Sequence, residues 1–429
     1  MKKFSLISLG CPKNTVDSEK VVNHLIKNGL ILVNENTSEE ILIINTCAFI
    51  KDAVSEAKKI IRDAIKRKKA KEINLIAVIG CLVSRFQKED LAQEFSGVDL
   101  WLSTKDEDQL FNKLNQIRQM DLSEENRNNV FTKITPFYYA YVKISEGCNN
   151  FCSYCTIPKI RGKYNSFKIE DIVAEVQNYV KLGVKEIILV AEDTTIWGID
   201  FYKKPSLHIL LENLVQIPDL PWIRVMYAHP KHVTNELISV MKKYPQICNY
   251  LDLPIQHVSD QILTKMNRKY TKSALEDLLI NLKQEIPDIA LRTSLILGFP
   301  GETEAEVSEL LEFIARYEFD HLGCFSFSKE QDTLAGSFLE QVKSTVALDR
   351  IEKIMNESVK IKKKINQELL GKTFDVIYEG NQIARSFREA PEIDSAIFLP
   401  KNNDLLRGVF YQAKIIEFED YDLIGEVEL

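Results

Sequence analysis

Short apolar runs alternate with longer amphipathic stretches over the first 120 residues. The runs Phe4–Leu9, Ile41–Ile44 and Leu75–Ile79 have the length and composition of buried strands. Apolar spacing and flanking residues predict helices from Asp17 to Gly29 and from about Asp52 to Ala70. Alternation of strands and helices predicts an α/β domain with a parallel sheet and right-handed crossovers.

The same alternation continues between residues 134 and 365. The strand patterns are Tyr139–Ile144, Glu186–Ala191, Ile223–Ala228, Tyr250–Ile255, Leu291–Leu297 and His321–Phe327. Helical patterns separate them, for example Ile169–Leu182, Leu207–Val215, Val233–Met241, Lys272–Lys283 and Glu304–Tyr317. Six βα units predict a partial, TIM-like (β/α)6 barrel whose site lies at the carboxyl ends of its strands.

Short alternating strands with Gly and Pro turns follow from residue 366 to the end. They lie near Gly371–Gly380, Ala396–Leu399, Gly408–Ile416 and Leu423–Glu428, and they predict a small antiparallel β-barrel. The polar stretch Asp121–Asn129 has no periodicity and is expected to be a linker. The chain therefore divides into three expected domains, at residues 1–120, 134–365 and 366–429.

Three cysteines follow the first strand of the second domain at a C-x3-C-x2-C spacing. Cys148, Cys152 and Cys155 lie within eight residues, and Gly147 and two asparagines let the backbone curl there. Three thiolates at this spacing suit one face of an iron–sulfur cube. Because no fourth cysteine lies nearby, one iron would be open to a substrate or cofactor. A zinc knuckle with four closing ligands, or a chance grouping of thiols, is the alternative.

Three further cysteines each follow a predicted strand of the first domain. Cys11, Cys47 and Cys81 come just past these strands, and the carboxyl ends of parallel strands lie on one edge, where ligands bind. A single cysteine is more often a small buried apolar residue. Three at the same structural position predict a second three-ligand cluster site.

Polar residues also occur at the later strands of the predicted barrel. Glu192 follows the second strand, Gln256 follows the fourth, and Arg292 lies within the fifth. These three residues are candidates to contact a bound nucleotide-like cofactor at the strand ends. For each one, a polar side chain satisfied within the fold is the alternative.

The composition is that of an ordinary globular protein, with 45% hydrophobic and 27% charged residues in 429. No run approaches the ~18 apolar residues of a membrane span, and a strand pattern begins at once after Met1, unlike a signal peptide. Eight cysteines, six of them at motif-like positions, indicate metal ligation in a reducing compartment. We therefore expect a cytoplasmic protein without a membrane partner.

The formal charge of −7 is concentrated in the last domain. Residues 366–429 hold 6 Lys/Arg and 13 Asp/Glu, a net of −7, so the rest of the chain is neutral. An acidic barrel disfavours a nucleic-acid backbone and favours a basic protein partner. The lysine-rich stretch from Lys58 to Lys71 is expected to be a solvated helix face.

The spacing of Cys148, Cys152 and Cys155, with Tyr154 before the last cysteine, resembles the signature of radical S-adenosylmethionine (SAM) enzymes. Together with the three-cysteine first domain and a last domain similar to TRAM domains, the whole chain resembles the methylthiotransferase family. The resemblance implies two 4Fe–4S clusters, SAM with Phe151 and Tyr154 as further contacts, and a low-potential electron donor such as flavodoxin or ferredoxin. It also implies that a radical from SAM takes a hydrogen from an unactivated carbon, which then receives the methylthio group.

Two segments resemble one branch of that family, RimO, which modifies an aspartate of ribosomal protein uS12. They are Ser8–Asn14 (Ser-Leu-Gly-Cys-Pro-Lys-Asn) and Arg385–Asp394. The resemblance implies a methylthio group added to the β-carbon of that aspartate, with the basic uS12 bound through the acidic barrel. A tRNA methylthiotransferase, whose branch has a Gly-Cys-Gln-Met-Asn-like sequence, is one alternative. A non-catalytic iron–sulfur electron carrier is the alternative from a different class.

One position departs from the family pattern. The family usually reads Arg-Gly-x-x-x-Ser-Arg after the cysteine stretch, and here Arg161 and Ser166 match but Phe167 follows. Any contact made by the usual arginine must therefore come from another cation or be absent.

Overall fold

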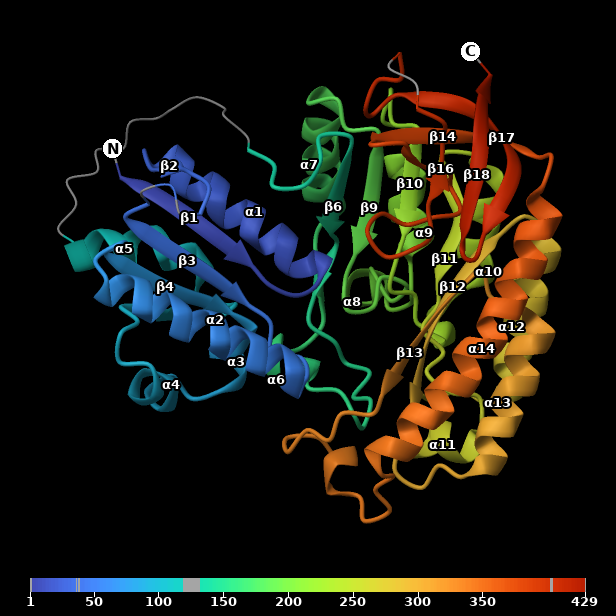
Figure 1. Cartoon of the computed structure of the whole chain (residues 1–429), viewed down its shortest axis with the longest axis horizontal. Helices are drawn as coiled ribbons and strands as arrows, with labels where there is room; N and C mark the ends of the chain where they lie inside the picture. The colour runs from blue at the N-terminus through green and yellow to red at the C-terminus, as the bar shows by residue number, and fades with distance from the viewer. Residues whose placement is uncertain (1, 36, 38, 119–131, 402–403, 429) are drawn as a thin grey trace.

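The computed structural model describes residues 2–35, 37, 39–118, 132–401 and 404–428, which form three domains packed against one another (Figure 1). The predicted linker at 121–129 lies outside the described residues. Among the helices in this part of the chain, none is long and apolar enough to cross a bilayer.

The first domain is a three-layer α/β sandwich. Its five-stranded sheet has the order β2-β1-β3-β4-β5, and every pairing is parallel. Apolar side chains of α1 and α5 pack on one face of the sheet, and those of α2 and α4 pack on the other. The elements are β1 (Lys3–Ser8), α1 (Pro12–Lys27), β2 (Ile31–Leu32), β3 (Ile41–Thr46), α2 (Lys51–Lys69), β4 (Leu75–Gly80), α3 (Cys81–Arg85), α4 (Lys88–Glu94), β5 (Leu100–Leu102) and α5 (Leu110–Arg118).

Helix α1 begins five residues earlier than the sequence pattern predicted. Pro12, not Asp17, occupies its first position, and Cys11 is the residue before it. Proline suits the first turn because its fixed φ is helical and its missing N–H would have no helical partner there. The earlier start places Lys13 and Asn14 in the first turn, directly after the first cysteine.

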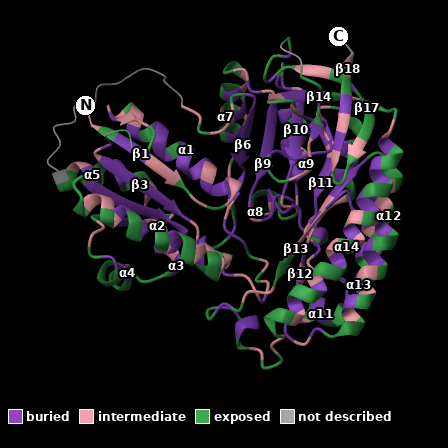
Figure 2. Ribbon diagram, viewed as in Figure 1, coloured by how far each residue is buried: buried purple, intermediate pink, exposed green. Residues whose placement is uncertain are grey.

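The second domain is an open barrel of six parallel strands, as predicted. The strand order is β13-β12-β11-β10-β9-β6, so sequential strands are neighbours. The strands are β6 (Tyr139–Lys143), β9 (Glu186–Val190), β10 (Trp222–Val225), β11 (Ile247–Asp252), β12 (Ala290–Leu297) and β13 (His321–Ser326). The main helices are α7 (Ile169–Lys181), α9 (Leu207–Leu214), α10 (Asn235–Lys243), α12 (Lys272–Glu285), α13 (Glu304–Tyr317) and α14 (Ser344–Leu369). Exposed positions lie along the outer faces of α12, α13 and α14, whereas most strand positions are buried (Figure 2).

The third domain is a closed barrel of five strands. The strands are β14 (Thr373–Gly380), β15 (Ile383–Arg385), β16 (Ile397–Phe398), β17 (Phe410–Glu419) and β18 (Asp422–Glu428). The order is β14-β15-β16-β18-β17, and the β16–β18 pair is parallel. The predicted small antiparallel barrel is therefore confirmed, and this one parallel pair is the exception within it. A closed ring with an odd number of strands cannot alternate direction throughout, so one pair must be parallel.

Residues 385–394, which we call the docking segment, join the third domain to the concave face of the second. Glu392 accepts hydrogen bonds from the hydroxyls of Tyr139 (2.7 Å) and Tyr141 (3.3 Å). Asp394 accepts a 2.7 Å bond from Tyr250. The strand residues in these contacts belong to the first two-thirds of each strand, so the small barrel lies toward the ends of the strands opposite their carboxyl termini.

Candidate active site

The loop that carries Cys148, Cys152 and Cys155 begins just after β6 and the short strand β7 (Ser145–Glu146). Gly147 has a φ of +73°, and a Cβ there would lie 2.3 Å from the Lys163 carbonyl oxygen, so glycine is required. The backbone N–H of Asn150 then points at the Cys148 sulfur, 3.5 Å away. The loop thus curls around its own thiols, as the sequence predicted.

Contacts with the rest of the core fix the position of this loop. Asn267 donates a 2.7 Å hydrogen bond to the Phe151 carbonyl, and Ser153 donates one of 2.7 Å to the Lys265 carbonyl. The backbone N–H of Ala335 binds the Ser153 carbonyl at 2.8 Å. The loop is held from both sides, so the three sulfurs keep one arrangement.

The three thiols suit a bound metal cluster. Burial raises the pKa of Cys148 to about 12 and that of Cys155 well above its ordinary value. A thiolate at such a depth needs a cation, and a coordinated metal ion deprotonates a thiol outright. The guanidinium of Arg268 lies 3.6 Å from the Cys152 sulfur and adds a fixed positive charge.

The structure brings Cys11, Cys47 and Cys81 together, as their positions after neighbouring strands predicted. They follow β1, β3 and β4, which are adjacent in the sheet. A Cβ on Gly10 would lie 3.0 Å from the Cys47 sulfur, so the first loop passes directly over that thiol. Burial, with a smaller contribution from the charges of the other two thiols, raises the pKa of Cys81 to about 12 despite the opposing charge of Arg161. Three sulfur ligands at one sheet edge also suit an iron–sulfur cluster.

A buried charge network beneath Cys81 joins the first two domains, and the sequence did not reveal it. Arg161 lies 3.3 Å from the Cys81 sulfur and donates bonds to Asn14 (2.5 Å) and Asp17 (2.7 Å). Lys143 binds the other oxygen of Asp17. Burial opposes ionisation of Asp17, yet the two cations hold its pKa below the ordinary value.

A second ion pair crosses between the domains. The Lys13 ammonium lies 3.3 Å from a carboxylate oxygen of Glu192, and both side chains are 9% exposed. Burial disfavours the charge on Lys13, but Glu192 and the Cys11 thiolate keep its pKa above the ordinary value. Glu192 was predicted from its place after β9, whereas Lys13 was not singled out because its contact depends on the domain packing.

A chain of hydrogen bonds links the turn after β10 to the loop that carries Cys148, Cys152 and Cys155, which we call the first cysteine loop. His232 Nδ1 lies 2.8 Å from Asp193, which accepts a 2.8 Å bond from Asn150. Burial opposes ionisation of Asp193, but the bond to His232 and the nearby His229 lower its pKa to about 2. The rings of His229 and His232 stack with their centroids 4.9 Å apart.

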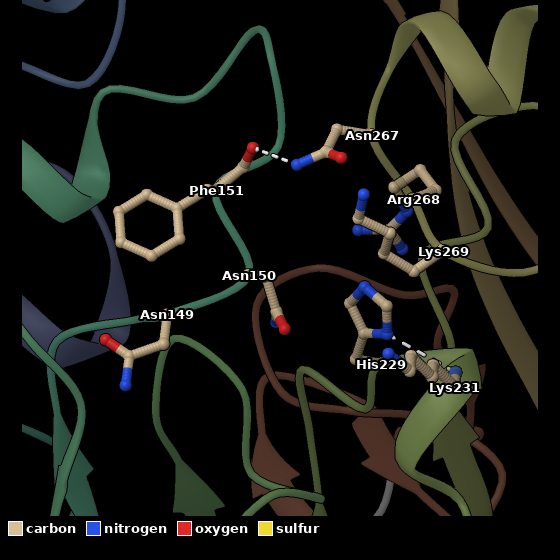
Figure 3. A pocket seen from close by; sticks show the side chains of 8 residues that line it. All are labelled: Asn149, Asn150, Phe151, His229, Lys231, Asn267, Arg268 and Lys269. Atoms are coloured by element: carbon tan, nitrogen blue, oxygen red, sulfur yellow. Dashed lines mark hydrogen bonds between the residues drawn. The ribbon is translucent and has the colours of Figure 1, made fainter.

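A pocket of about 230 Å³ opens beside the first cysteine loop. Three segments line it: the loop itself, the turn after β10 and the turn after α11 (Asp260–Lys265) (Figure 3). Arg268 and His229 face one another across it, while the Phe151 ring points away from both. The lining residues are Asn149, Asn150, Phe151, His229, Lys231, Asn267, Arg268 and Lys269.

The other predicted contacts occupy different surroundings. Tyr154 is partly buried near Cys152 and Arg268, and Gln256 follows β11 in a left-handed conformation with φ +67°. Arg292 lies instead between two carboxylates, 3.0 Å from Asp252 and 3.2 Å from Asp394 of the docking segment.

At the position of the usual family arginine, Phe167 packs against the apolar core of the second domain. The Lys20 ammonium lies 5.5 Å from the centre of its ring. A cation from the first domain therefore lies beside this position, on the aromatic face that attracts it.

Family models match most of the chain. The radical SAM superfamily model covers residues 142–314, that of uncharacterized protein family UPF0004 covers 3–103, and the TRAM domain model covers 370–427. The chain is 41% identical to a protein of Clostridium botulinum (strain Hall) and 40% identical to one of Geobacter sulfurreducens. Each match covers 99% of this chain and 98% of the relative, and both relatives are named ribosomal protein uS12 methylthiotransferase RimO.

Solved structures share the fold. The radical SAM methyltransferase TsrM from Kitasatospora setae matches with a TM-score of 0.58 and 15% identity, over 78% of this chain and 77% of that one. The cobalamin-dependent radical SAM enzyme OxsB matches with a TM-score of 0.52 and 13% identity, over 85% and 56%. At these identities the likeness concerns the fold alone.

Proposed function

Because this chain belongs to the RimO family of radical SAM methylthiotransferases, we propose that it adds a methylthio group to the β-carbon of an aspartate in ribosomal protein uS12. The observation that carries this proposal is the pair of three-cysteine sets, one at the strand ends of the first domain and one after the first strand of the core, with the Lys13–Glu192 ion pair joining the two domains. A non-catalytic electron carrier needs neither an open ligand position nor this barrel. The named relatives favour uS12 over a tRNA substrate.

Each set of cysteines would hold one 4Fe–4S cluster, which makes two per chain. Cys148, Cys152 and Cys155 would bind the cluster that contacts SAM, and Cys11, Cys47 and Cys81 would bind the auxiliary cluster. When bound, the first cluster and SAM supply the radical that removes a hydrogen from the target carbon. A low-potential donor such as flavodoxin or ferredoxin would deliver the electron.

The chain's own residues position these groups and exclude water from them. Asp193 holds Asn150 and so orients the first cysteine loop, while Asn267 and Ser153 anchor it. We propose Glu192, Phe151, Tyr154 and Gln256 as contacts of SAM. For Arg292, whose guanidinium is bound to two carboxylates, we propose the role of anchoring the docking segment instead.

Anaerobic reconstitution with iron and sulfide tests the activity. We expect about eight irons per chain, and a methylthio mass gain on uS12 after SAM and a reductant are added. Cys152→Ala should abolish deoxyadenosine formation, whereas Cys47→Ala should preserve it but stop the mass gain on uS12. A mass gain on tRNA in place of uS12 would contradict the proposed substrate. SAM cleavage at the wild-type rate in the Cys152→Ala variant would contradict the assignment of the SAM cluster to these cysteines.

We also propose that the acidic barrel binds the basic uS12. Glu417, Glu419 and Glu426 are exposed on β17 and β18, whereas Glu379 and Asp394 are bound to arginines. Because the barrel lies away from the carboxyl ends of the core strands, uS12 must extend along the core to reach the cysteines.

Neutralising these three exposed carboxylates (Glu417→Gln, Glu419→Gln and Glu426→Gln together) should weaken uS12 binding at low salt and flatten its salt dependence. Isothermal titration calorimetry at two salt concentrations measures the dissociation constant for uS12 and its salt dependence. The matched control is Glu89→Gln with Asp90→Asn, which removes exposed charge from α4 of the first domain. Losses that are equal per charge removed in the two variants would show that net charge, not the barrel, attracts uS12.

A further inference from the structure

Lys13 places a cation between the two sets of cysteines. It lies in the first turn of α1, two residues after Cys11. Its ammonium reaches across the domain boundary to the end of β9, 3.3 Å from Glu192 and 3.5 Å from the Ala191 carbonyl. The face of Tyr227 lies beneath it, with the ring centre 3.8 Å away.

Both sets of thiols lie within electrostatic range of this ion pair. Lys13 is close enough to Cys11 and Cys47 for their charges to interact with its own. Glu192 interacts in the same way with Cys148 and Cys155. The Lys13–Glu192 pair therefore lies between the two cysteine triads. The target carbon must also lie there, because one site activates it and the other site modifies it.

Lys13 is held more loosely than the other cations described near the thiols. Arg161 donates bonds of 2.5 and 2.7 Å, and Arg268 donates one of 2.6 Å to the Pro254 carbonyl. The contacts of Lys13, at 3.3 and 3.5 Å, exceed the ~2.7–2.9 Å of a strong charge-assisted bond. An ammonium has three N–H donors, so Lys13 can donate a hydrogen bond to an incoming carboxylate and lose less existing hydrogen bonding than Arg161 or Arg268 would.

We propose that Lys13 binds the side-chain carboxylate of the target aspartate and so fixes its β-carbon between the two cysteine triads. This inference rests on the proposed function. A carboxylate that enters here meets thiolates and Glu192, which repel it, so it needs a cation that is already in place. The β-carbon is bonded directly to the carboxylate carbon, so a bound carboxylate leaves it little freedom. Tyr227 stabilises the ammonium in this position through its ring face.

A double-mutant cycle between enzyme and substrate tests this assignment. Dissociation constants are measured for wild-type and Lys13→Met chains, each without iron, against uS12 and against uS12 with the target aspartate changed to asparagine. We expect Lys13→Met to weaken binding of the aspartate form roughly 10- to 100-fold. Changing the target aspartate to asparagine should then weaken binding to the Lys13→Met chain very little, because the interaction between lysine and aspartate is already absent.

Two further variants and a kinetic measurement complete the test. Lys13→Arg should recover part of the lost affinity, because it restores the cation. Lys27→Met removes an exposed lysine from the last turn of the same helix and should leave uS12 binding unchanged. In reconstituted enzyme, Lys13→Met should raise the KM for uS12 while its iron content equals that of wild type.

The outcomes separate this inference from the proposed function. If the wild type modifies uS12 but Lys13→Met distinguishes aspartate from asparagine as strongly as before, the role of Lys13 is overturned and the function stands. If the wild type neither binds nor modifies uS12, the proposed function fails and the inference fails with it.

Discussion

At the scale of single residues, the site depends on charges that are buried at a domain boundary. Asp17 of the first domain is bound by Lys143 and Arg161 of the second, and Arg161 reaches the Cys81 sulfur at 3.3 Å. Breaking one partner of such a group leaves an uncompensated buried charge, which costs several kcal/mol. The auxiliary cysteines are therefore held by residues of both domains.

Glu107 lies at the edge of this network and makes the stability of the folded state depend on pH. Burial, and then the charge of Asp17, raise the pKa of Glu107 to about 8. The unfolded chain ionises this group near its ordinary pKa, so between that value and about pH 8 the folded state binds the extra proton. Stability is thus lost as the pH rises through this window. Glu107→Gln should raise the melting temperature at pH 8.5 by roughly 2–4 °C and leave it unchanged at pH 4.

Thermal unfolding at the two pH values measures this difference. Asp108→Asn removes an exposed carboxylate from the adjacent position and should alter neither melting temperature. A gain for Glu107→Gln that is equally large at pH 4 would show that the benefit is not electrostatic.

The placement of the six cysteines and Glu192 after strands could be predicted from the sequence, because strand ends are visible as local patterns. Arg161, Lys143 and Asp17 carry no such signal, since each is one charged residue whose partner lies over 100 positions away. The ion pair of Arg292 with Asp394 could not be inferred for the same reason. The position of Arg292 within a strand was clear, but its partner Asp394 belongs to another domain.

At the scale of elements, the docking segment joins the small barrel to the core through buried ion pairs. Arg385 binds Glu186 at 2.8 Å and Glu379 at 2.7 Å, and Glu186 also binds Arg224 at 2.6 Å. This segment resembles one family branch in sequence, and in the structure its charged residues also contact the core.

Arg385→Met should destabilise the protein by about 3–5 kcal/mol, because it leaves Glu379 without its cation and Glu186 with only one. Urea unfolding measures the change. The control is Lys372→Met, which removes an exposed lysine beside the same barrel. If both variants unfold at the wild-type midpoint, the ion pair with Glu186 contributes no net stability.

Helices and strands with long periodic patterns were predicted closely, and α13 coincides with its predicted range of Glu304–Tyr317. The short strands β2 and β5 were missed, because two or three residues give no readable alternation. The early start of α1 had a signal in Pro12, which is favoured at the first helical position.

At the scale of the whole molecule, one loop of the core reaches back to hold the first domain. Arg85 of α3 binds Glu330 at 2.6 Å and Asp332 at 3.1 Å, and it donates a 2.8 Å bond to the carbonyl of Ala48, the neighbour of Cys47. The hydrogen bond from Arg85 lowers the pKa of Asp332 to about 2. The contribution of Asp332 to stability is therefore present above its ordinary pKa and lost as the pH falls toward 2.

Arg85→Met should loosen the first domain from the core and speed hydrogen exchange in α3 and around Asp332. Exchange measured by mass spectrometry on the iron-free chain detects this directly. Arg62→Met removes an exposed arginine that pairs with Glu94 inside the first domain, and it should leave the same peptides protected. Unchanged protection in Arg85→Met would mean that other contacts hold the domains together.

The position of the docking segment also has a consequence for how the molecule is made. The last strand of the core ends at Ser326, yet Tyr139, Tyr141 and Tyr250 on its concave face donate hydrogen bonds to Glu392 and Asp394 of the last domain. A ribosome must therefore translate nearly the whole chain before the core can be completed. Until then the nascent protein exposes an aromatic surface that its own C-terminal domain will cover, and a prematurely terminated chain would keep that surface open.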